Sequence, residues 1–237
     1  MKNNNINNNL TALVLCGGKG ERLHPITKKI PKPLIKIKNK EILSYLIDHL
    51  QYCGIEDIII ASGYKHRLLK NFVERKYKSK KIRIINSGID TEIIKRLKKT
   101  KKHSKKNLLI CYGDTLANIN IKKLYKFHNS HKCPVTISCF QVKSNFGILK
   151  ISKNNIINSY IEKPFLDIWF NIGYMIFNKK IFSYFSKFEK FEFLLKYLVK
   201  KSKIKSFKHR GLHITINTLK ELEEANKEVG DFEKKIK

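Results

Sequence analysis

The sequence LTALVLCGGKGERLHP, residues 10–25, joins a mostly apolar run to a loop that contains three glycines. Apolar runs of about seven residues that end in glycine are typical of buried strands. Glycine lets the backbone approach a ligand closely, and the N–H groups of such a loop can point at phosphate oxygens. The spacing matches neither the P-loop nor the dinucleotide-binding pattern. The segment therefore predicts a buried strand that runs into an anion-binding loop of another kind.

Further apolar runs follow this strand and alternate with helical patterns. Strands are expected at residues 57–61, 81–85 and 107–112, and helices at 41–52, 67–77 and 120–129. Strands separated by helices of about a dozen residues favour right-handed βαβ units and a parallel sheet that is covered on both faces. We therefore expect an α/β fold, a Rossmann-like three-layer sandwich around a mostly parallel, mixed central sheet.

The second half of the chain has a more mixed α+β pattern. Strands are expected at residues 135–142, 147–151, 156–161, 174–177, 204–207 and 213–216, and helices at 180–185, 191–201 and 219–229. No repeat and no linker rich in proline, glycine or serine interrupts the chain. We expect one domain over residues 10–237, preceded by an asparagine-rich disordered tail, residues 1–9.

Composition narrows the function classes. The 237 residues carry 50 lysines and arginines against 19 acidic residues, a net charge of +31. Only six of the basic residues are arginine, the side chain that nucleic-acid readers favour, so nucleic acid is not the expected partner. The lysine-rich run at residues 98–106 and the pair His128 and His131 are expected to be solvated.

Cysteine use and hydropathy indicate the compartment. The five cysteines include no C-x-x-C pair and lie in apolar runs, which favours a reducing, cytoplasmic location. No apolar segment of about 18 residues occurs, so membrane insertion is not expected.

The glycine loop continues into a longer signature, G-G-x-G-x-R-L-x-P-x-T-x-x-x-P-K-P-L, between residues 17 and 34. This string resembles the signature of the sugar-1-phosphate nucleotidyltransferases, which make nucleotide sugars. Further matches follow in the family's order; they are Gly63-Tyr64-Lys65, Tyr112-Gly113-Asp114, Asn145-Phe146-Gly147, Glu162-Lys163-Pro164 and Asn171-Ile172-Gly173. The resemblance covers about residues 10–230. Within the family it is greatest to the glucose-1-phosphate cytidylyltransferases, whose C-G-Y-K motif resembles Ser62-Gly63-Tyr64-Lys65.

Two positions depart from the family pattern. A T-G-G motif expected near the base and ribose is replaced by Ile93-Ile94-Lys95. Late in the chain, Asn217 stands where the family has an aspartate that acts as a second metal ligand. Asparagine can coordinate a metal through its carbonyl oxygen but brings no charge.

The resemblance implies a reaction in which an NTP, CTP in the first instance, and a sugar 1-phosphate give a nucleotide sugar and pyrophosphate, as in polysaccharide biosynthesis. The implied catalytic residues are Arg22, Lys32, Asp114 and Lys163. The implied nucleotide-binding residues are Leu15, Gly17, Gly18, Gly20, Gly63, Arg96 and Gly113. The implied sugar-binding residues are Gly147, Glu162 and Asn171. The implied cofactor is Mg²⁺, held by Asp114 and Asn217, and a homo-oligomer is possible.

Three alternatives stay open at this point. The same reaction could use another base and make a GDP-, dTDP- or UDP-sugar. A homologue without activity could bind nucleotide sugars; retention of Arg22, Lys32, Asp114 and Lys163 argues against it, whereas Asn217 argues for it. A basic nucleic-acid binder is the third, and steep salt dependence of RNA binding would favour it.

Overall fold

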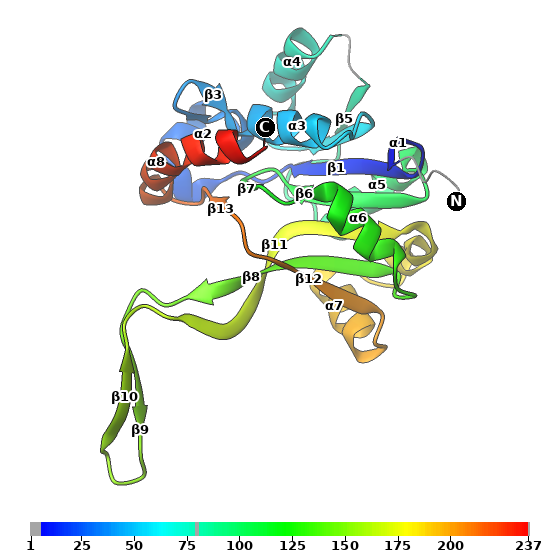
Figure 1. The fold of residues 1–237 in the computed structure, drawn as a ribbon. Helices are drawn as coiled ribbons and strands as arrows, with labels where there is room; N and C mark the ends of the chain where they lie inside the picture. The colour runs from blue at the N-terminus through cyan, green and yellow to red at the C-terminus, as the bar shows by residue number, and fades with distance from the viewer. Residues whose placement is uncertain (1–5, 79–80, 237) are drawn as a thin grey trace.

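A seven-stranded sheet forms the centre of the computed structural model, which describes residues 6–78 and 81–236. Figure 1 shows the sheet with the chain coloured from its N-terminus to its C-terminus. The strand order is β12 (Ile204–His209), β8 (Val135–Lys143), β11 (Phe165–Asn178), β6 (Asn107–Tyr112), β1 (Leu10–Cys16), β4 (Ile58–Ser62) and β5 (Ile82–Asn86).

The strands are mostly parallel, and β1 lies between β6 and β4. Strand β1 pairs in parallel with both neighbours, β4 pairs in parallel with β5, and β12 pairs in parallel with β8. Only β11 runs antiparallel to its neighbours β6 and β8. The carboxyl ends of β1, β4 and β6 therefore meet at one edge of the sheet, where open α/β proteins bind their ligands.

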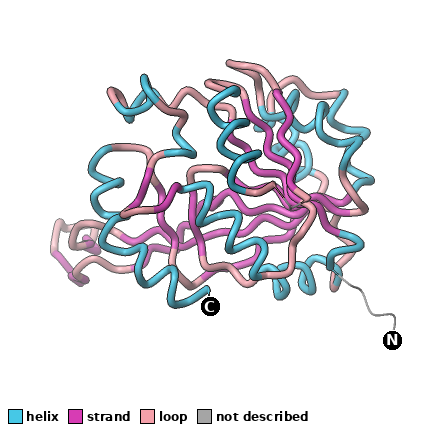
Figure 2. The backbone as a smooth tube through the Cα atoms, turned by 90° about the horizontal axis from the view of Figure 1, so that it is seen from above, coloured by secondary structure: helices cyan, strands magenta, loops and turns pink. Residues whose placement is uncertain are grey.

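Helices cover both faces of the sheet, as the view in Figure 2 also shows. Alternate residues of β1 enter two separate cores: Ala12 and Val14 belong to the first, and Leu13 to the second. The first core also takes apolar residues of α3 (Ile42–Tyr52), α4 (His66–Lys76), α6 (Ile121–Asn129) and α8 (Leu219–Ile236). The second takes those of α5 (Ile93–Thr100), the 3-10 helix η4 (Lys179–Ser186) and α7 (Phe191–Lys200). The expected three-layer α/β sandwich is confirmed.

Short elements connect the larger ones around the glycine loop and behind it. They are η1 (Glu21–Leu23), α2 (Ile26–Lys29), η2 (Lys32–Leu34), the paired strands β2 (Lys36–Ile37) and β3 (Lys40–Glu41), and η3 (Lys101–His103). Strands β7 (Thr115–Ala117) and β13 (His213–Thr215) pair antiparallel beyond the end of β6. The described residues include no helix long and apolar enough to cross a membrane.

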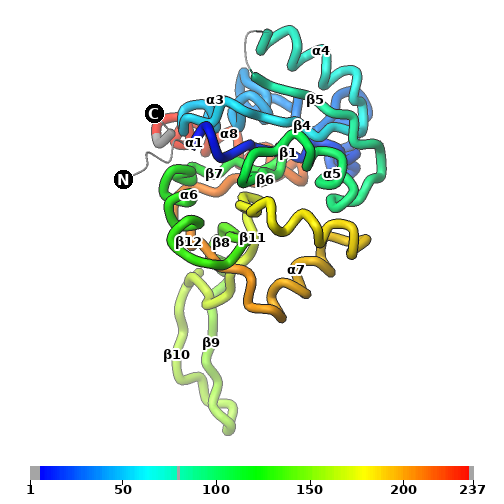
Figure 3. The backbone as a smooth tube through the Cα atoms, turned by 90° about the vertical axis from the view of Figure 1, so that its right-hand side faces the viewer, coloured from blue at the N-terminus to red at the C-terminus, as the bar shows by residue number. Residues whose placement is uncertain are grey.

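A hairpin stands away from this body. Among the described residues, strands β9 (Ile148–Ile151) and β10 (Ile157–Ile161) pair with each other and with no other strand. Figures 1 and 3 both show the hairpin projecting beyond the sheet from the ends of β8 and β11. We call residues 144–170 the arm. Two register shifts in the pairing of β11 with β8, one between Phe165 and Trp169 and one between Asn171 and Met175, bend β11 at the root of the arm.

Three expectations from the sequence need correction. Residues 1–5 of the predicted tail lie outside the described residues, but Ile6–Asn9 form the single turn α1, and Ile6 packs against the first core. The lysine-rich run at residues 98–106 is not simply solvated, because α5 includes its first residues and buries Thr100. Burial of Ile94 and Leu97 stabilises α5 although its outer face is basic.

The third correction concerns His128, which is buried and not solvated. Its Nδ1 lies 2.8 Å from Oγ1 of Thr136, and burial lowers the pKa of its imidazole to about 4. Burial likewise lowers the pKa of His49 and of His213 to about 4. These three rings are therefore neutral parts of the folded core at neutral pH.

Because these histidines are buried and neutral, we expect acid to destabilise the fold at pH values well above the range in which carboxylates titrate. In the unfolded chain each histidine takes up a proton below about pH 6.5. The folded chain does so only near the lowered pKa, so the unfolded state binds more protons between these values. The free energy of unfolding should fall by several kcal/mol between pH 7 and pH 5. Urea unfolding at stepped pH measures this, and His128→Gln should flatten the slope whereas exposed His24→Gln should not. A slope that is the same in both variants would contradict the assignment.

Candidate active site

The glycine loop follows β1 at the central edge of the sheet and forms one wall of a pocket of about 470 Å³. Gly18 has open space where a side chain would be. Gly20 has a φ of 67°, in the left-handed region that favours glycine, and its carbonyl accepts a 2.9 Å hydrogen bond from Oγ1 of Thr27. The loop therefore folds back on the segment that carries the next part of the signature, and its backbone stays accessible.

Lys32 joins three parts of the chain at the floor of this pocket. Its Nζ lies 2.6 Å from a carboxylate oxygen of Asp114 and 3.0 Å from the side-chain carbonyl oxygen of Asn217. Nη2 of Arg22 donates to the same oxygen of Asn217 over 3.3 Å. Only 10% of the Lys32 side chain is exposed, so these partners stabilise its buried ammonium group in place of water. Residues 22, 32, 114 and 217, far apart in the sequence, thus form one polar cluster.

A capping box at the start of α8 fixes Asn217. Glu221 accepts hydrogen bonds from the backbone N–H groups of Asn217 and Thr218, and Oγ1 of Thr218 accepts one from the backbone N–H of Glu221. On the other side, the backbone N–H of Ile216 donates to the carbonyl of Asp114 over 3.3 Å. Glu221 thereby positions Asn217. The T-x-x-E spacing of residues 218–221 signals this capping box in the sequence, but Glu221 was not among the residues expected at the site.

The cluster fits a magnesium ion only with help from a substrate. Asp114 and Asn217 offer a carboxylate and a carbonyl oxygen, the ligand types that Mg²⁺ prefers. In the described part of the chain, no group of three or more histidines, cysteines or acidic residues gathers to hold a metal. Phosphate oxygens and water would have to complete the coordination, which is the usual way that Mg²⁺ binds to nucleotide enzymes.

Arg96 lies behind the loop and not in the pocket. Its guanidinium donates to the carbonyls of Thr91 and Ser62 over 3.0 and 3.3 Å and to the hydroxyl of Ser87. A Cβ on Gly17 would lie 1.7 Å from its Nη1, and a Cβ on Gly63 would lie 2.3 Å from the carbonyl oxygen of Gly88. Burial lowers the pKa of Arg96. Here Arg96, Gly17 and Gly63 pack the loop tightly from the rear.

The end of β6 forms the opposite wall. Gly113 packs where a Cβ would lie 2.5 Å from Sγ of Cys16, and its N–H donates to the carbonyl of Leu15 over 3.0 Å. Burial raises the pKa of the Cys16 thiol, and the Asp114 carboxylate raises it further, so Cys16 is an uncharged neighbour of the site. The lining residues also include Lys19 and Asp90, an ion pair of 2.8 Å at the mouth.

None of the residues expected at the sugar end lines this pocket. Asn171 lies on β11 beside Tyr112, and its carbonyl oxygen accepts a 2.8 Å hydrogen bond from the N–H of Gly173. Glu162, Lys163 and Gly147 belong to the arm, where the side chains of Glu162 and Lys163 are more than half exposed and lie 3.7 Å apart. Lys163 has a φ of 45° directly before a proline, a strained conformation for a residue with a side chain. The structure therefore brings together Leu15, Gly18, Gly20, Arg22, Lys32, Gly113, Asp114 and Asn217, but not the three arm residues.

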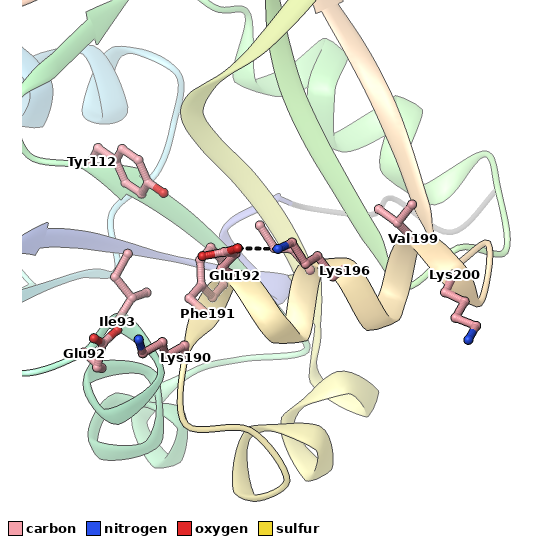
Figure 4. A pocket seen from close by; sticks show the side chains of 10 residues that line it. Glu92, Ile93, Tyr112, Lys190, Phe191, Glu192, Lys196, Val199 and Lys200 are labelled. Atoms are coloured by element: carbon pink, nitrogen blue, oxygen red, sulfur yellow. Dashed lines mark ion pairs between the residues drawn. The ribbon is translucent and has the colours of Figure 1, made fainter.

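A larger hollow of about 820 Å³ lies between α5 and α7, with Tyr112 at its edge (Figure 4). Its charged side chains include Glu192 and Lys196, which Figure 4 shows as an ion pair and which lie 2.5 Å apart. Size would favour this hollow as a ligand site. The smaller pocket has the chemistry for phosphate, because cations, a carboxylate and a glycine-rich backbone converge there.

Sequence comparison identifies known relatives of the chain. The family model described as "Nucleotidyl transferase" matches residues 11–231. A "Probable glucose-1-phosphate cytidylyltransferase" of Bacillus subtilis is 30% identical over 92% of this chain and 95% of its own length. A "D-glycero-alpha-D-manno-heptose 1-phosphate guanylyltransferase" of Aneurinibacillus thermoaerophilus is 31% identical over 84% of this chain and 87% of its own.

Solved structures share the fold. A putative glucose-1-phosphate thymidylyltransferase from Bacillus anthracis superposes with a TM-score of 0.74 at 20% identity, covering 92% of this chain and 94% of that chain. HddC from Yersinia pseudotuberculosis superposes with a TM-score of 0.71 at 25% identity, covering 92% and 99%. With the signature loop, the family match over nearly the whole length and the polar cluster at the carboxyl ends of β1 and β6, the chain belongs to the nucleotidyl transferase family.

Proposed function

We propose that the chain transfers a nucleotidyl group from an NTP, with CTP favoured, to a sugar 1-phosphate and releases pyrophosphate. The observation that carries this proposal is the convergence of Arg22, Lys32 and Asp114 on the glycine-lined pocket. A phosphate oxygen of the sugar 1-phosphate attacks the α-phosphorus in line, a new P–O bond forms, and the bond to pyrophosphate breaks. The attacking oxygen is already an anion, so the step needs no general base.

The pocket residues act by positioning and by neutralising charge. The backbone at Gly18 and Gly20 cradles the phosphates, and Arg22 stabilises the charge that develops on the leaving pyrophosphate. Lys32 neutralises the α-phosphate and holds Asp114 in place in the absence of substrate. When bound, Mg²⁺ would supply additional positive charge at the phosphates, held by Asp114 and the carbonyl oxygen of Asn217.

The nucleotide base that the chain uses is proposed on narrower grounds. The motif at residues 62–65 and the Bacillus subtilis relative favour CTP. The heptose-phosphate relative is a guanylyltransferase, which supports GTP as the second candidate. The family's T-G-G motif is replaced by the first turn of α5, where Ile94 is fully buried, so base recognition would rely on the adjoining loop of residues 86–91.

A pyrophosphate-release screen tests the proposal. The full chain is incubated with each of several NTPs, a panel of sugar 1-phosphates and Mg²⁺, with excess EDTA as the control. We expect turnover that EDTA abolishes, with the highest kcat/KM for CTP. Nucleotide binding without turnover of any pair would favour the alternative of an inactive nucleotide-sugar binder. Steep salt dependence of RNA binding without turnover would favour the nucleic-acid binder instead.

Loss of a pocket cation should slow the chemical step. Arg22 is exposed, so Arg22→Ala should leave the fold intact and lower kcat by about a hundredfold or more, the usual effect of removing one transition-state donor. Lys32→Met, which keeps the buried volume, should also lower kcat by about a hundredfold or more. Steady-state kinetics measure both, with exposed Lys28→Ala as the matched control. Near-normal kcat in the Arg22 and Lys32 variants, with an unchanged circular dichroism spectrum, would remove these residues from the mechanism.

A carboxylate at position 217 should strengthen the metal site. Asn217→Asp adds a negative charge beside Asp114, so half-maximal rate should need less Mg²⁺ than in the natural chain. The natural chain itself should hold little Mg²⁺ without nucleotide, which isothermal titration calorimetry measures. Asn120→Asp is the control, because Asn120 caps α6 and aspartate caps as well. If the Mg²⁺ dependence is unchanged in Asn217→Asp, Asn217 does not contact the metal.

Lys163 should act on the sugar phosphate alone. Its side chain is 59% exposed and its ion-pair partner is Glu162, so Lys163→Ala should not unfold the chain. We expect KM for the sugar 1-phosphate to rise far more than KM for the nucleotide, because ground-state binding is lost at one end of the site. Lys153→Ala, elsewhere on the arm, is the control. Equal effects on both KM values would place Lys163 elsewhere.

A further inference from the structure

Segments rich in lysine line the edge of the sheet that lies opposite the glycine loop. Residues 101–106 precede β6, residues 179–180 follow the antiparallel strand β11, and residues 200–203 precede β12. Together with position 132, shortly before β8, they hold ten lysines; these are Lys101, Lys102, Lys105, Lys106, Lys132, Lys179, Lys180, Lys200, Lys201 and Lys203. The three segments contain no aspartate or glutamate. We call these ten residues the basic patch.

The register of the sheet brings the parts of the basic patch side by side. One row of paired residues crosses four neighbouring strands at this edge; it consists of Leu108, Phe177, Val135 and Ile204. Neighbouring strands lie about 4.8 Å apart, so the row spans only about 15 Å. Beyond the row, the N–H of Lys179 donates to the carbonyl of Lys106 over 2.9 Å, and Sγ of Cys133 donates to the carbonyl of Ser202 over 3.5 Å. The basic patch is therefore one continuous surface.

Most lysines of the basic patch have no anionic neighbour. In the described part of the chain, Lys105 alone among the ten forms an ion pair, 3.6 Å from Asp57, and Asp57 also pairs with Arg83. Eight of the ten side chains are exposed, whereas Lys105 and Lys203 are half-buried. Positive charges gathered at this density repel one another. An anionic partner would relieve that repulsion.

The basic patch is more than a consequence of the high net charge of the chain. The four helices that pack on the first core, α3, α4, α6 and α8, carry eleven lysines and arginines against eight acidic residues, so that face is nearly balanced. A lysine bias spread evenly along the chain would leave acidic residues in the patch segments as well. The positive field is therefore directional, and the basic patch is one of its sources.

The chemistry of the basic patch favours an anionic lipid surface over nucleic acid. Recognition of nucleic acid relies on the planar guanidinium of arginine and on aromatic rings that stack on bases. Residues 101–106, 179–180 and 200–203 contain no arginine, phenylalanine, tyrosine or tryptophan. Lysine is a compact point charge, and each lysine near an anionic bilayer strengthens binding about fivefold. Several exposed lysines on one surface are thus enough for attachment without sequence or shape recognition.

Attachment by this edge leaves the candidate active site open. Lys106 directly precedes β6, and Gly113, which lines the pocket, directly follows it. The six residues of β6 span about 20 Å in an extended strand, so the pocket and the basic patch lie at opposite ends of β6. Substrates can then reach the pocket from solvent while the basic patch contacts another surface.

We propose that the basic patch docks the chain onto a bilayer surface that carries anionic lipid headgroups. The attachment is electrostatic and peripheral, because the exposed ammonium groups contact headgroup phosphates and no segment enters the hydrocarbon. It depends on ionic strength, since salt screens charges at an exposed surface. The docking does not depend on the proposed enzyme activity.

Co-sedimentation of the full chain with lipid vesicles tests the docking. One set of vesicles is phosphatidylcholine alone, and the other is phosphatidylcholine with an equal part of phosphatidylglycerol. At low salt we expect the chain to bind the anionic vesicles and to leave the neutral vesicles unbound. Addition of salt to about 1 M should release the bound chain, because the screening length then falls to about 3 Å.

Removing four charges of the basic patch should weaken vesicle binding by about a hundredfold or more. The variant combines four exposed positions, Lys101→Gln, Lys102→Gln, Lys200→Gln and Lys201→Gln. The matched control removes four exposed charges elsewhere, by Lys28→Gln, Lys29→Gln, Lys122→Gln and Lys123→Gln, and should bind nearly as well as the natural chain. Circular dichroism checks that both variants fold.

Two results would overturn the docking directly. One is the absence of binding to anionic vesicles at low salt, and the other is an equal loss of binding in the patch variant and in its control. Binding to single-stranded RNA that is tighter than binding to anionic vesicles at the same salt, and that is lost in the patch variant, would also overturn it, with nucleic acid as the occupant. Sedimentation needs no turnover, so a chain that binds vesicles without nucleotidyl transfer would fail the proposed function and still support the docking.

Discussion

The site depends on the contacts that the ammonium group of Lys32 makes. This group holds a carboxylate from the end of β6 and an amide oxygen from the start of α8, 82 and 185 residues away in the chain. Because Lys32 is almost fully buried, removing either partner would leave a charge in a poorly solvated place. The same contact therefore fixes the path of three segments and assembles the polar groups that line the candidate site. In the proposed function, a phosphate or its bound metal ion would take the place of Asp114 and Asn217 beside an ammonium group that is already in position.

The second constraint is the close approach of other groups to the backbone. It explains the positions of the glycines better than a need for flexibility does. Of the five glycines expected to bind nucleotide, Gly18, Gly20 and Gly113 line the pocket, whereas Gly17 and Gly63 leave room for Arg96 and for the carbonyl of Gly88. Arg96 in turn ties the ends of β4 and β5 to the segment before α5. The loop is thus rigid at the rear and open at the front, which is what a preorganised phosphate cradle requires.

Much of the fold could be predicted from local pattern. Continuous apolar runs predict β1, β4 and β6, and helical spacing predicts α3 and α4. Helix α5 was missed because its exposed face is rich in lysine and only two of its buried residues, Ile94 and Leu97, are apolar. His128 was assigned to solvent because the sequence shows no further metal-type ligand near it, yet its partner Thr136 comes from the adjoining strand. The capping box around Glu221 was visible in sequence, but its importance follows only from Asn217 lying beside Lys32.

The sequence by itself determined the glycine-rich half of the candidate site, because residues 17–34 form one continuous signature and strand ends in a parallel sheet meet at one edge. It also determined that Asp114 follows a central strand. Only the tertiary structure decided that Asn217 joins Lys32, and that Glu162 and Lys163 stand on an arm. The physical reason is β11: the nine residues from Lys163 to Asn171 span up to about 26 Å when extended, and the register shift between Phe165 and Trp169 sets the direction in which they run. Bulges and side-chain burial depend on the neighbouring strands, and no local pattern records them.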